Sequence, residues 1–192
     1  MSALKTLNLP DGFKIEIHRS DLSNPFDDQE GVFVLDSFGR RSIRGQSADH
    51  VESLKRAQDE NMHVFAVRAY AHSGEAYSLV KGDWKAKHSN PFPPASSGQM
   101  WDSGWQGYLL VSKKEFPKRA KAYEAAKGML KCYQAYANGE GYGWQYVNPE
   151  GDTEDSCWGY YNEEDCMQDA QAAHQHRIDQ EGEQLSLPLE EG

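Results

Sequence analysis

Short runs of β-branched and aromatic residues, broken by turn residues, dominate this sequence, and only three stretches have helical spacing. The strand-like runs lie at residues 13–17, 31–35, 62–71, 75–81, 105–112, 142–147 and 156–161. Helical patterns lie at 47–61, at 117–138 and from Asn162 to a point before Gly182, where we expect the last helix to end. This order predicts an α+β fold with a mainly antiparallel sheet and two or three helices.

The length and composition favour one folded domain followed by a polar tail. The chain has 192 residues, of which 11% are aromatic, and this aromatic content argues against wholesale disorder. The mean hydropathy of −0.82 indicates that a polar segment dilutes a modest core. We therefore expect a domain over residues 1–178 and a flexible acidic tail over residues 179–192.

The negative charge is concentrated in the last quarter of the chain. The formal net charge is −10, yet residues 1–138 carry a net charge of +3. Residues 139–192 hold Arg177 against 14 acidic residues, a net charge of −13. Three interpretations stay open: a solvated acidic end that aids solubility, a lure for a basic partner, or a tail that avoids nucleic acid.

Several short motifs in the body occur together in a fixed order. They are H-S-G at 72–74, W-D-S-G-x-x-G-Y at 101–108, V-S-K at 111–113, Y-x-x-Y/A-x-N-G-E-x-Y-G at 133–143 and D-S-C-W-G-Y-Y at 155–161. The set resembles a family of small proteins from bacteriophages and related mobile elements, over roughly residues 62–161. The resemblance implies a bacterial cytoplasm and a phage or mobile-element origin, and it carries no catalytic role.

The residues of these motifs have two interpretations. The large aromatic residues of these motifs are expected in the core, where each buries much area. They are Trp101, Trp105, Tyr108, Trp144 and Trp158. The glycines Gly104, Gly107 and Gly143 are expected to serve turns, bulges or close packing. Asp102 and Asp155 each precede a serine and are expected to bond their own backbone in Asx-turns. The alternative is a pocket at strand ends in which Trp101, Asp102, Ser103 and Asp155 form a ligand-binding or structural loop.

The sequence offers no recognisable catalytic constellation. The run Ser156-Cys157-Trp158 resembles that around the nucleophile of papain-like proteases, but only His174 and His176 follow it, on a polar helix where we expect solvated side chains. The two histidines are two residues apart and point about 200° apart on a helix, so they cannot share a metal ion. Phosphate- and dinucleotide-binding glycine motifs are absent. We therefore expect a non-enzymatic protein without metal or cofactor.

Three further absences in the sequence predict a cytoplasmic location. Apolar runs are too short for a transmembrane helix, and the first ten residues hold no apolar stretch typical of a secretory signal. The three cysteines, Cys132, Cys157 and Cys166, have no framework spacing and are interpreted as reduced thiols of a cytoplasmic protein.

Two basic clusters leave two interpretations open, direct contact with nucleic acid or a solvated charged surface. One is Arg40, Arg41 and Arg44, and the other comprises Lys113, Lys114, Lys118, Arg119 and Lys121. Basic residues near aromatic ones hold phosphates in nucleic-acid-binding proteins, whereas charged helix faces are usually just solvated.

The end of the chain carries the most specific signal. Residues 184–189 read Q-L-S-L-P-L and resemble the hexapeptide by which bacterial polymerases and repair proteins dock on the DNA sliding clamp. The partner-binding residues implied by this resemblance are Gln184, Leu185, Ser186, Leu187, Pro188 and Leu189. An extended segment inserts alternate side chains into separate pockets, so three leucines would supply apolar contact and Gln184 directional hydrogen bonds. The alternative is a tail folded back on its own domain through the same leucines.

Two functions from different classes follow. The first is a phage or mobile-element accessory protein that docks on the host sliding clamp and modulates replication or other host processes at DNA. The second is an acidic inhibitor that imitates nucleic-acid charge against a bacterial defence system such as restriction or CRISPR. Such mimicry needs ordered carboxylates at phosphate-like spacing rather than many acids alone.

Overall fold

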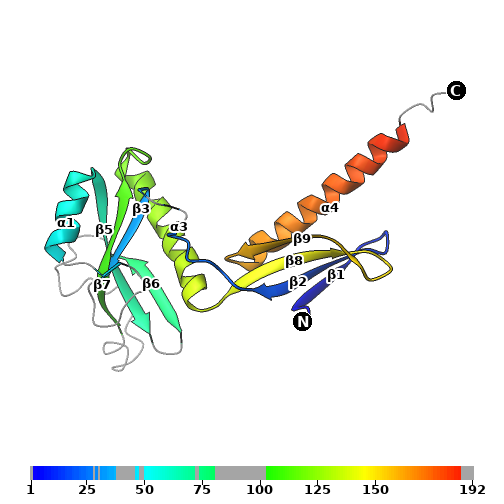
Figure 1. Cartoon of the computed structure of the whole chain (residues 1–192), viewed down its shortest axis with the longest axis horizontal. Helices are drawn as coiled ribbons and strands as arrows, with labels where there is room; N and C mark the ends of the chain where they lie inside the picture. The colour runs from blue at the N-terminus through cyan, green and yellow to red at the C-terminus, as the bar shows by residue number, and fades with distance from the viewer. Residues whose placement is uncertain are drawn as a thin grey trace. The chain divides into compact units, whose positions relative to one another are not determined.

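The computed structural model describes residues 2–27, 29, 31–37, 46–47, 50–71, 74–80 and 103–186. Backbone contacts divide the chain into two compact units (Figure 1). Unit 1 consists of Met1–Ser23 and Gly139–Gly192, and unit 2 consists of Asn24–Asn138. The predicted α+β class is confirmed. The expected domain over residues 1–178 includes parts of both units. The division into units was not predicted, because local sequence patterns do not reveal that the first strands pair with strands after Gly139.

Unit 1 contains a four-stranded antiparallel sheet in the order β1-β2-β8-β9. Its strands are β1 (Lys5–Asn8), β2 (Lys14–Ser20), β8 (Gly141–Val147) and β9 (Thr153–Tyr160). The central pair aligns Ile15 with Tyr146 and Ile17 with Trp144, so one face of the sheet is apolar. The alternation at residues 13–17 predicted this strand, whereas β1 was not expected.

The helix α4 (Glu163–Ser186) covers the apolar face of this sheet. Cys166 and Ala170 are buried against the isoleucines of β2 and the aromatic residues of β8. Asn162 is the predicted N-cap, and its Oδ1 accepts a hydrogen bond from the Asp165 backbone nitrogen at 2.8 Å. The expectation that the helix ends before Gly182 is wrong. One helical glycine costs only about 1 kcal/mol, and its Glu and Gln neighbours are good helix formers.

Unit 2 contains a sheet in the order β4-β3-β7-β5-β6. Its strands are β3 (Phe33–Ser37), β4 (Gln46–Ser47), β5 (Met62–Ala71), β6 (Glu75–Leu79) and β7 (Ser103–Ser112). All pairs are antiparallel except β3 with the two-residue β4. The predicted β5–β6 hairpin is confirmed. The strand β7 is central, as predicted, and three consecutive residues, Leu109, Leu110 and Val111, are fully buried.

Two helices cover opposite faces of the unit 2 sheet. Leu109 and Val111 pack with the buried side chains of α3 (Arg119–Ala137), whereas the alternate residues Tyr108 and Leu110 pack with Ala57 of α1 (His50–Asp59). Successive side chains of a strand point to opposite faces, so the two helices sandwich β7. The sequence predicted both helices, each a few residues too long.

Side chains of α3 cover the exposed edge of the sheet. The edge strand β6 presents the backbone nitrogen and oxygen of Glu75, which bond the carboxamide of Asn138 at 2.8 Å each. The Tyr77 backbone nitrogen donates to Oε1 of Gln134 at 3.1 Å. These side-chain carboxamides bond backbone groups of β6 that could otherwise form hydrogen bonds with a strand of another chain. The helix then stops at Asn138, as predicted, with Gly139 in the left-handed region at φ +66°.

Candidate functional site

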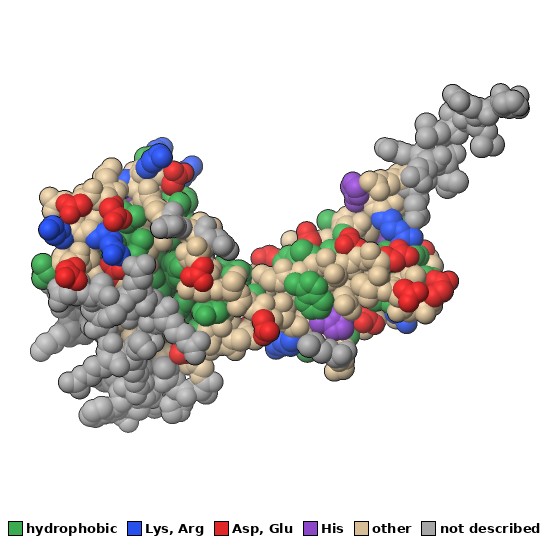
Figure 2. Space-filling model, in the orientation of Figure 1, with side chains coloured by type: hydrophobic (Ala, Val, Ile, Leu, Met, Phe, Trp, Pro, Cys, Tyr) green, Lys and Arg blue, Asp and Glu red, His purple; other side chains and the backbone are tan. Residues whose placement is uncertain are grey.

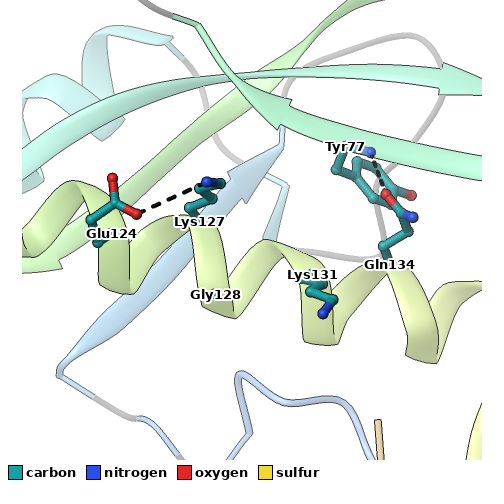
Figure 3. A pocket seen from close by; sticks show the side chains of 6 residues that line it. All are labelled: Tyr77, Glu124, Lys127, Gly128, Lys131 and Gln134. Carbon is teal, nitrogen blue, oxygen red and sulfur yellow. Dashed lines mark hydrogen bonds and ion pairs between the residues drawn. The ribbon is translucent and has the colours of Figure 1, made fainter. Parts of the chain in front are cut away.

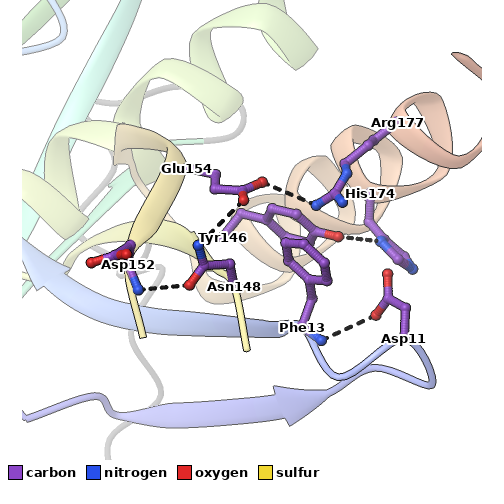
Figure 4. Close-up of polar contacts among 8 residues, drawn as sticks. All are labelled: Asp11, Phe13, Tyr146, Asn148, Asp152, Glu154, His174 and Arg177. Atoms are coloured by element: carbon purple, nitrogen blue, oxygen red, sulfur yellow. Dashed lines mark hydrogen bonds and ion pairs between the residues drawn. The ribbon is translucent and has the colours of Figure 1, made fainter. Parts of the chain in front are cut away.

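A cluster that we call the α4 anchor joins α4 to its sheet (Figure 4). It consists of Arg177 on α4, Phe13 next to β2, Tyr146 on β8 and Glu154 on β9. The Arg177 guanidinium carbon lies 3.7 Å from the centroid of the Phe13 ring and 5.1 Å from that of Tyr146. Its Nη1 lies 3.1 Å from Oε2 of Glu154. Stacking and ion pairing therefore fix one point of the helix against the sheet.

His174 supports the same cluster from one turn earlier. Its Nδ1 lies 3.0 Å from the Tyr146 hydroxyl, and the side chain is half-buried. The expectation of a solvated histidine is therefore wrong for His174, because α4 turns this side chain towards the sheet. His176 is exposed, as expected.

Beyond the α4 anchor, the helix leaves its sheet. Ile178, Asp179 and Gln180 are exposed, and 44% of Ile178 is accessible although it is apolar. Figure 1 shows α4 extending past the end of the strands that it covers. The first three residues of the candidate docking peptide, Gln184–Ser186, form the end of this helix. The last three, Leu187, Pro188 and Leu189, lie outside the described residues.

A polar network lies under the first turns of α4. Oδ2 of Asp169 accepts a hydrogen bond from Nε1 of Trp144 at 3.0 Å and another from the Tyr160 hydroxyl. Burial, followed by the bond to Asp169, raises the pKa of Tyr160 above its ordinary range. Burial, reinforced by the charge of Asp169, raises the pKa of the Cys166 thiol to about 11. Both groups are thus neutral at pH 7.

The S-C-W run lies in β9 of unit 1. Cys157 is half-buried on β9, opposite Trp144 in the register, and it packs against the unit 1 core. A catalytic thiol needs a base within reach, whereas the hydrogen bond recorded for His174 goes to Tyr146. In the part of the chain that the structure describes, no group of three or more His, Cys, Asp or Glu side chains could hold a metal ion.

The aromatic residues of the body motifs divide between core and surface. Tyr108 and Trp144 are buried, as predicted, at 1% and 3% exposure. Trp158 contradicts the prediction, because 45% of it is exposed. It points away from α4 and lies over Gly143, where an added Cβ would be 2.1 Å from the indole ring. Close packing is one of the three roles expected for Gly143, and it is the one that this contact supports.

The residues of the alternative ligand pocket are only partly described. Trp101 and Asp102 lie outside the described residues. Ser103 begins β7 in unit 2, whereas Asp155 lies in β9 of unit 1, so the two belong to different sheets. Oδ1 of Asp155 accepts a hydrogen bond from the Ser156 backbone nitrogen at 2.7 Å, whereas the expected Asx-turn would bond the backbone two residues on.

The division of charge follows the division into units. Residues 1–23 contain three basic and three acidic residues, so unit 1 keeps the net charge of −13 and unit 2 has +3. Figure 2 shows acidic side chains on the visible surface of unit 1. Within unit 2, residues 113–131 hold seven Lys or Arg against two Glu. The first basic cluster, Arg40, Arg41 and Arg44, lies outside the described residues.

Unit 2 also contains an ion pair between a buried carboxylate on β3 and a partly exposed arginine on α1. Asp36 is fully buried, and its Oδ1 lies 3.0 Å from Nη1 of Arg56. A buried carboxylate needs such a partner, since its desolvation is costly. The pair connects α1 to the sheet, and the sequence pattern did not identify it.

No protein-family model, curated protein or solved structure matches the chain. Among the described residues, no helix is both long enough and apolar enough to cross a membrane.

Sequence reasoning missed two sets of residues that this geometry brings together. One is the α4 anchor, whose members are far apart in sequence. The other is an open groove between β6 and α3, where Gly128 lies between Lys127 and Lys131. A glycine inside a helical pattern is a detectable signal, because it costs about 1 kcal/mol relative to alanine.

Proposed function

We propose that this protein is a non-enzymatic accessory protein of a phage or mobile element that docks on the bacterial DNA sliding clamp through residues 184–189. It would act in the bacterial cytoplasm and modulate replication or other host processes at DNA. The resemblance of Q-L-S-L-P-L to clamp-binding hexapeptides supports the choice of partner.

The single observation that carries the proposal is the exposure of Ile178, Asp179 and Gln180 on α4. The side chains of α4 are described as far as Gln180, and among them the last contacts with the sheet are those of Arg177, seven residues before Gln184. A docking peptide must be able to leave its own domain, and the exposure of residues 178–180 is consistent with that requirement.

Docking requires the end of α4 to change conformation. Leu185 and Leu187 are two residues apart, and in a helix their side chains would point about 200° apart. An extended backbone places them on one side, together with Leu189. The last turn of a helix lacks backbone hydrogen-bond partners, and Gly182 weakens it further, so unwinding costs little. Burial of each leucine yields roughly 1.5–3 kcal/mol before ordering costs, consistent with micromolar binding of about −8 kcal/mol.

Calorimetry with a purified sliding clamp tests this proposal. We expect the full chain to bind with a dissociation constant on the order of micromolar. Leu185→Ala with Leu187→Ala removes two apolar anchors and should weaken binding at least about tenfold. Ile178→Ala is the matched control, because it removes an exposed apolar side chain from the same helix outside the peptide. Equal binding by the parent and the double variant, or no binding by the parent, would overturn the proposal.

The second candidate, acidic mimicry, is favoured by the concentration of negative charge in unit 1. The positions of the acids on α4 weaken it. They cluster at Glu163, Glu164, Asp165 and Asp169, and the next is Asp179, ten residues or about 15 Å further along. Nucleic acid carries regularly spaced charges, so mimicry predicts binding to a restriction or CRISPR complex that weakens steeply with salt. Binding that is insensitive to salt would exclude this function.

A further inference from the structure

An open groove of about 410 Å³ lies beside α3 in unit 2 (Figure 3). Tyr77 on β6 and five residues of α3 line it: Glu124, Lys127, Gly128, Lys131 and Gln134. Its volume is in the range of small-ligand sites. The hydrogen bond from the Tyr77 backbone nitrogen to Gln134 fixes the strand and the helix at one end of this groove.

Gly128 lines the groove without contributing a side chain to it. It lies in the interior of α3, where glycine costs about 1 kcal/mol relative to alanine. A Cβ built at this position would meet no atom within 4 Å, so no close approach of the protein to itself requires the glycine. The missing side chain leaves the helix backbone accessible to a ligand in the groove.

The charged side chains of the groove favour an anion. Lys127 and Lys131 are four residues apart, about 6 Å along the helix axis. The nearest recorded acidic partner, Glu124, lies 4.0 Å from Lys127, and about 70% of each side chain is exposed, so this pair neutralises little. Exposed Lys118 and Lys121 continue the basic surface towards the start of α3.

Arg119 differs from these lysines because it has a structural role. Its Nη2 donates to the Val64 carbonyl oxygen at 3.0 Å, and its guanidinium lies 4.6 Å from the centroid of the Phe65 ring. It therefore fixes α3 to the sheet, whereas the exposed lysines have no comparable packing role.

We propose that the groove between β6 and α3 binds phosphate groups of nucleotides, with Lys127 and Lys131 as the phosphate ligands and Gly128 providing room for the sugar-phosphate. Phosphates of single-stranded nucleic acid and of free nucleotides share this chemistry. The basic surface at Lys118 and Lys121 favours the polymer, because it offers further phosphate contacts along the helix.

The net charge of −10 does not prevent such binding. At 0.1 M salt the screening length is about 10 Å, so a phosphate in the groove responds mainly to the lysines beside it. The inference is independent of clamp docking, because it concerns different residues in a different unit.

Fluorescence anisotropy with a labelled 20-nucleotide single strand at 100 mM salt tests the proposal. A parallel titration uses fluorescently labelled adenosine monophosphate as a second, directly observed probe. Lys127→Gln with Lys131→Gln removes both cations, and Gly128→Gln fills the groove while favouring the helix. Lys55→Gln on α1 is the matched control, since it removes an exposed helical lysine from the same unit.

We expect the double lysine variant and Gly128→Gln each to bind the oligonucleotide at least about tenfold more weakly than Lys55→Gln. The slope of log affinity against log salt should fall by about 1.4 in the double variant, for two lost single-strand phosphate contacts. If the groove variants lose only binding of the mononucleotide, the site is confirmed and its ligand is a free nucleotide. If the parent binds neither probe, or the groove variants match Lys55→Gln, the proposal is wrong.

Discussion

The two long helices of this protein have opposite relations to their sheets. The 19-residue α3 buries Ala122, Ala126, Leu130, Tyr133 and Ala135 along its length, and the Asn138 that caps it bonds the edge of β6. The 24-residue α4 buries Cys166 and Ala170 in its first half and makes its last recorded sheet contacts at Arg177. Thus α3 contributes buried residues along its length, whereas residues 178–180 of α4 are exposed.

The same contrast holds for the two units. Unit 2 has helices on both faces of its sheet and a net charge of +3. Unit 1 has α4 on one face, the exposed Trp158 on the other, and a net charge of −13. We therefore expect unit 2 to dominate the stability of the protein. We expect the stability of unit 1 to depend on substitutions in α4.

The largest expected effect is on the core under α3. Leu130→Ala removes a side chain that is only 2% exposed, and we expect the free energy of unfolding to fall by about 2–5 kcal/mol. Urea unfolding measures this loss. Leu54→Ala, at a position that is 39% exposed, is the control and should cost much less. A loss below about 1 kcal/mol for Leu130→Ala would refute the core role of α3.

The next effect is on the α4 anchor. Arg177→Gln removes the stacking on Phe13 and Tyr146 and the ion pair with Glu154, and should destabilise unit 1 by about 1–2 kcal/mol. Hydrogen exchange should accelerate at the amides of β8 while those of β7 stay protected. Gln180→Ala, beyond the anchor, is the control. Unchanged protection in β8 would show that Arg177 does not hold the helix.

A smaller effect depends on pH. The Cys166 thiol has a pKa near 11 when folded against about 9 for an ordinary cysteine, so the unfolded chain loses its proton first as pH rises. The contribution of the neutral, buried thiol to the free energy of unfolding is therefore complete below pH 9 and is lost between pH 9 and 11. By pH 9.5 the loss should reach about 1 kcal/mol.

Urea unfolding at pH 7.5 and 9.5 measures this dependence. The parent should lose more stability than Cys166→Ala over this interval, and Cys132→Ala in unit 2 should behave as the parent. An identical pH dependence in the parent and Cys166→Ala would mean that burial of this thiol does not control the effect.

The smallest effect concerns the end of α4. Gly182→Ala stabilises the helix by up to about 1 kcal/mol. If docking requires Gln184–Ser186 to unwind, the variant should bind the sliding clamp up to about fivefold more weakly. Gln180→Ala serves as the control. Tighter binding by Gly182→Ala would mean that the peptide docks as a helix.

The sequence predicted most individual elements and little of their assembly. Alternating Ile15 and Ile17 indicated a strand, and Asn162 and Asn138 marked helix ends, because these signals are local. The pairing of β2 with β8 spans more than 120 residues and has no local signal. The exposure of Trp158 was missed for a similar reason, since burial depends on which sheet face a helix covers.

The candidate sites likewise differ in whether their residues are consecutive in the sequence or are brought together by folding. The peptide at 184–189 was recognisable because its residues are consecutive. The α4 anchor and the groove beside α3 combine residues that only folding brings together, although Gly128 within a helical pattern was a local clue.

Nuclear magnetic resonance of the isotope-labelled protein, with and without a sliding clamp, tests the central claim most directly. We expect the amide signals of residues 184–189 to shift or broaden on addition of the clamp, with those of β7 and β8 unchanged. Unperturbed tail signals, or changes confined to the two sheets, would contradict the account.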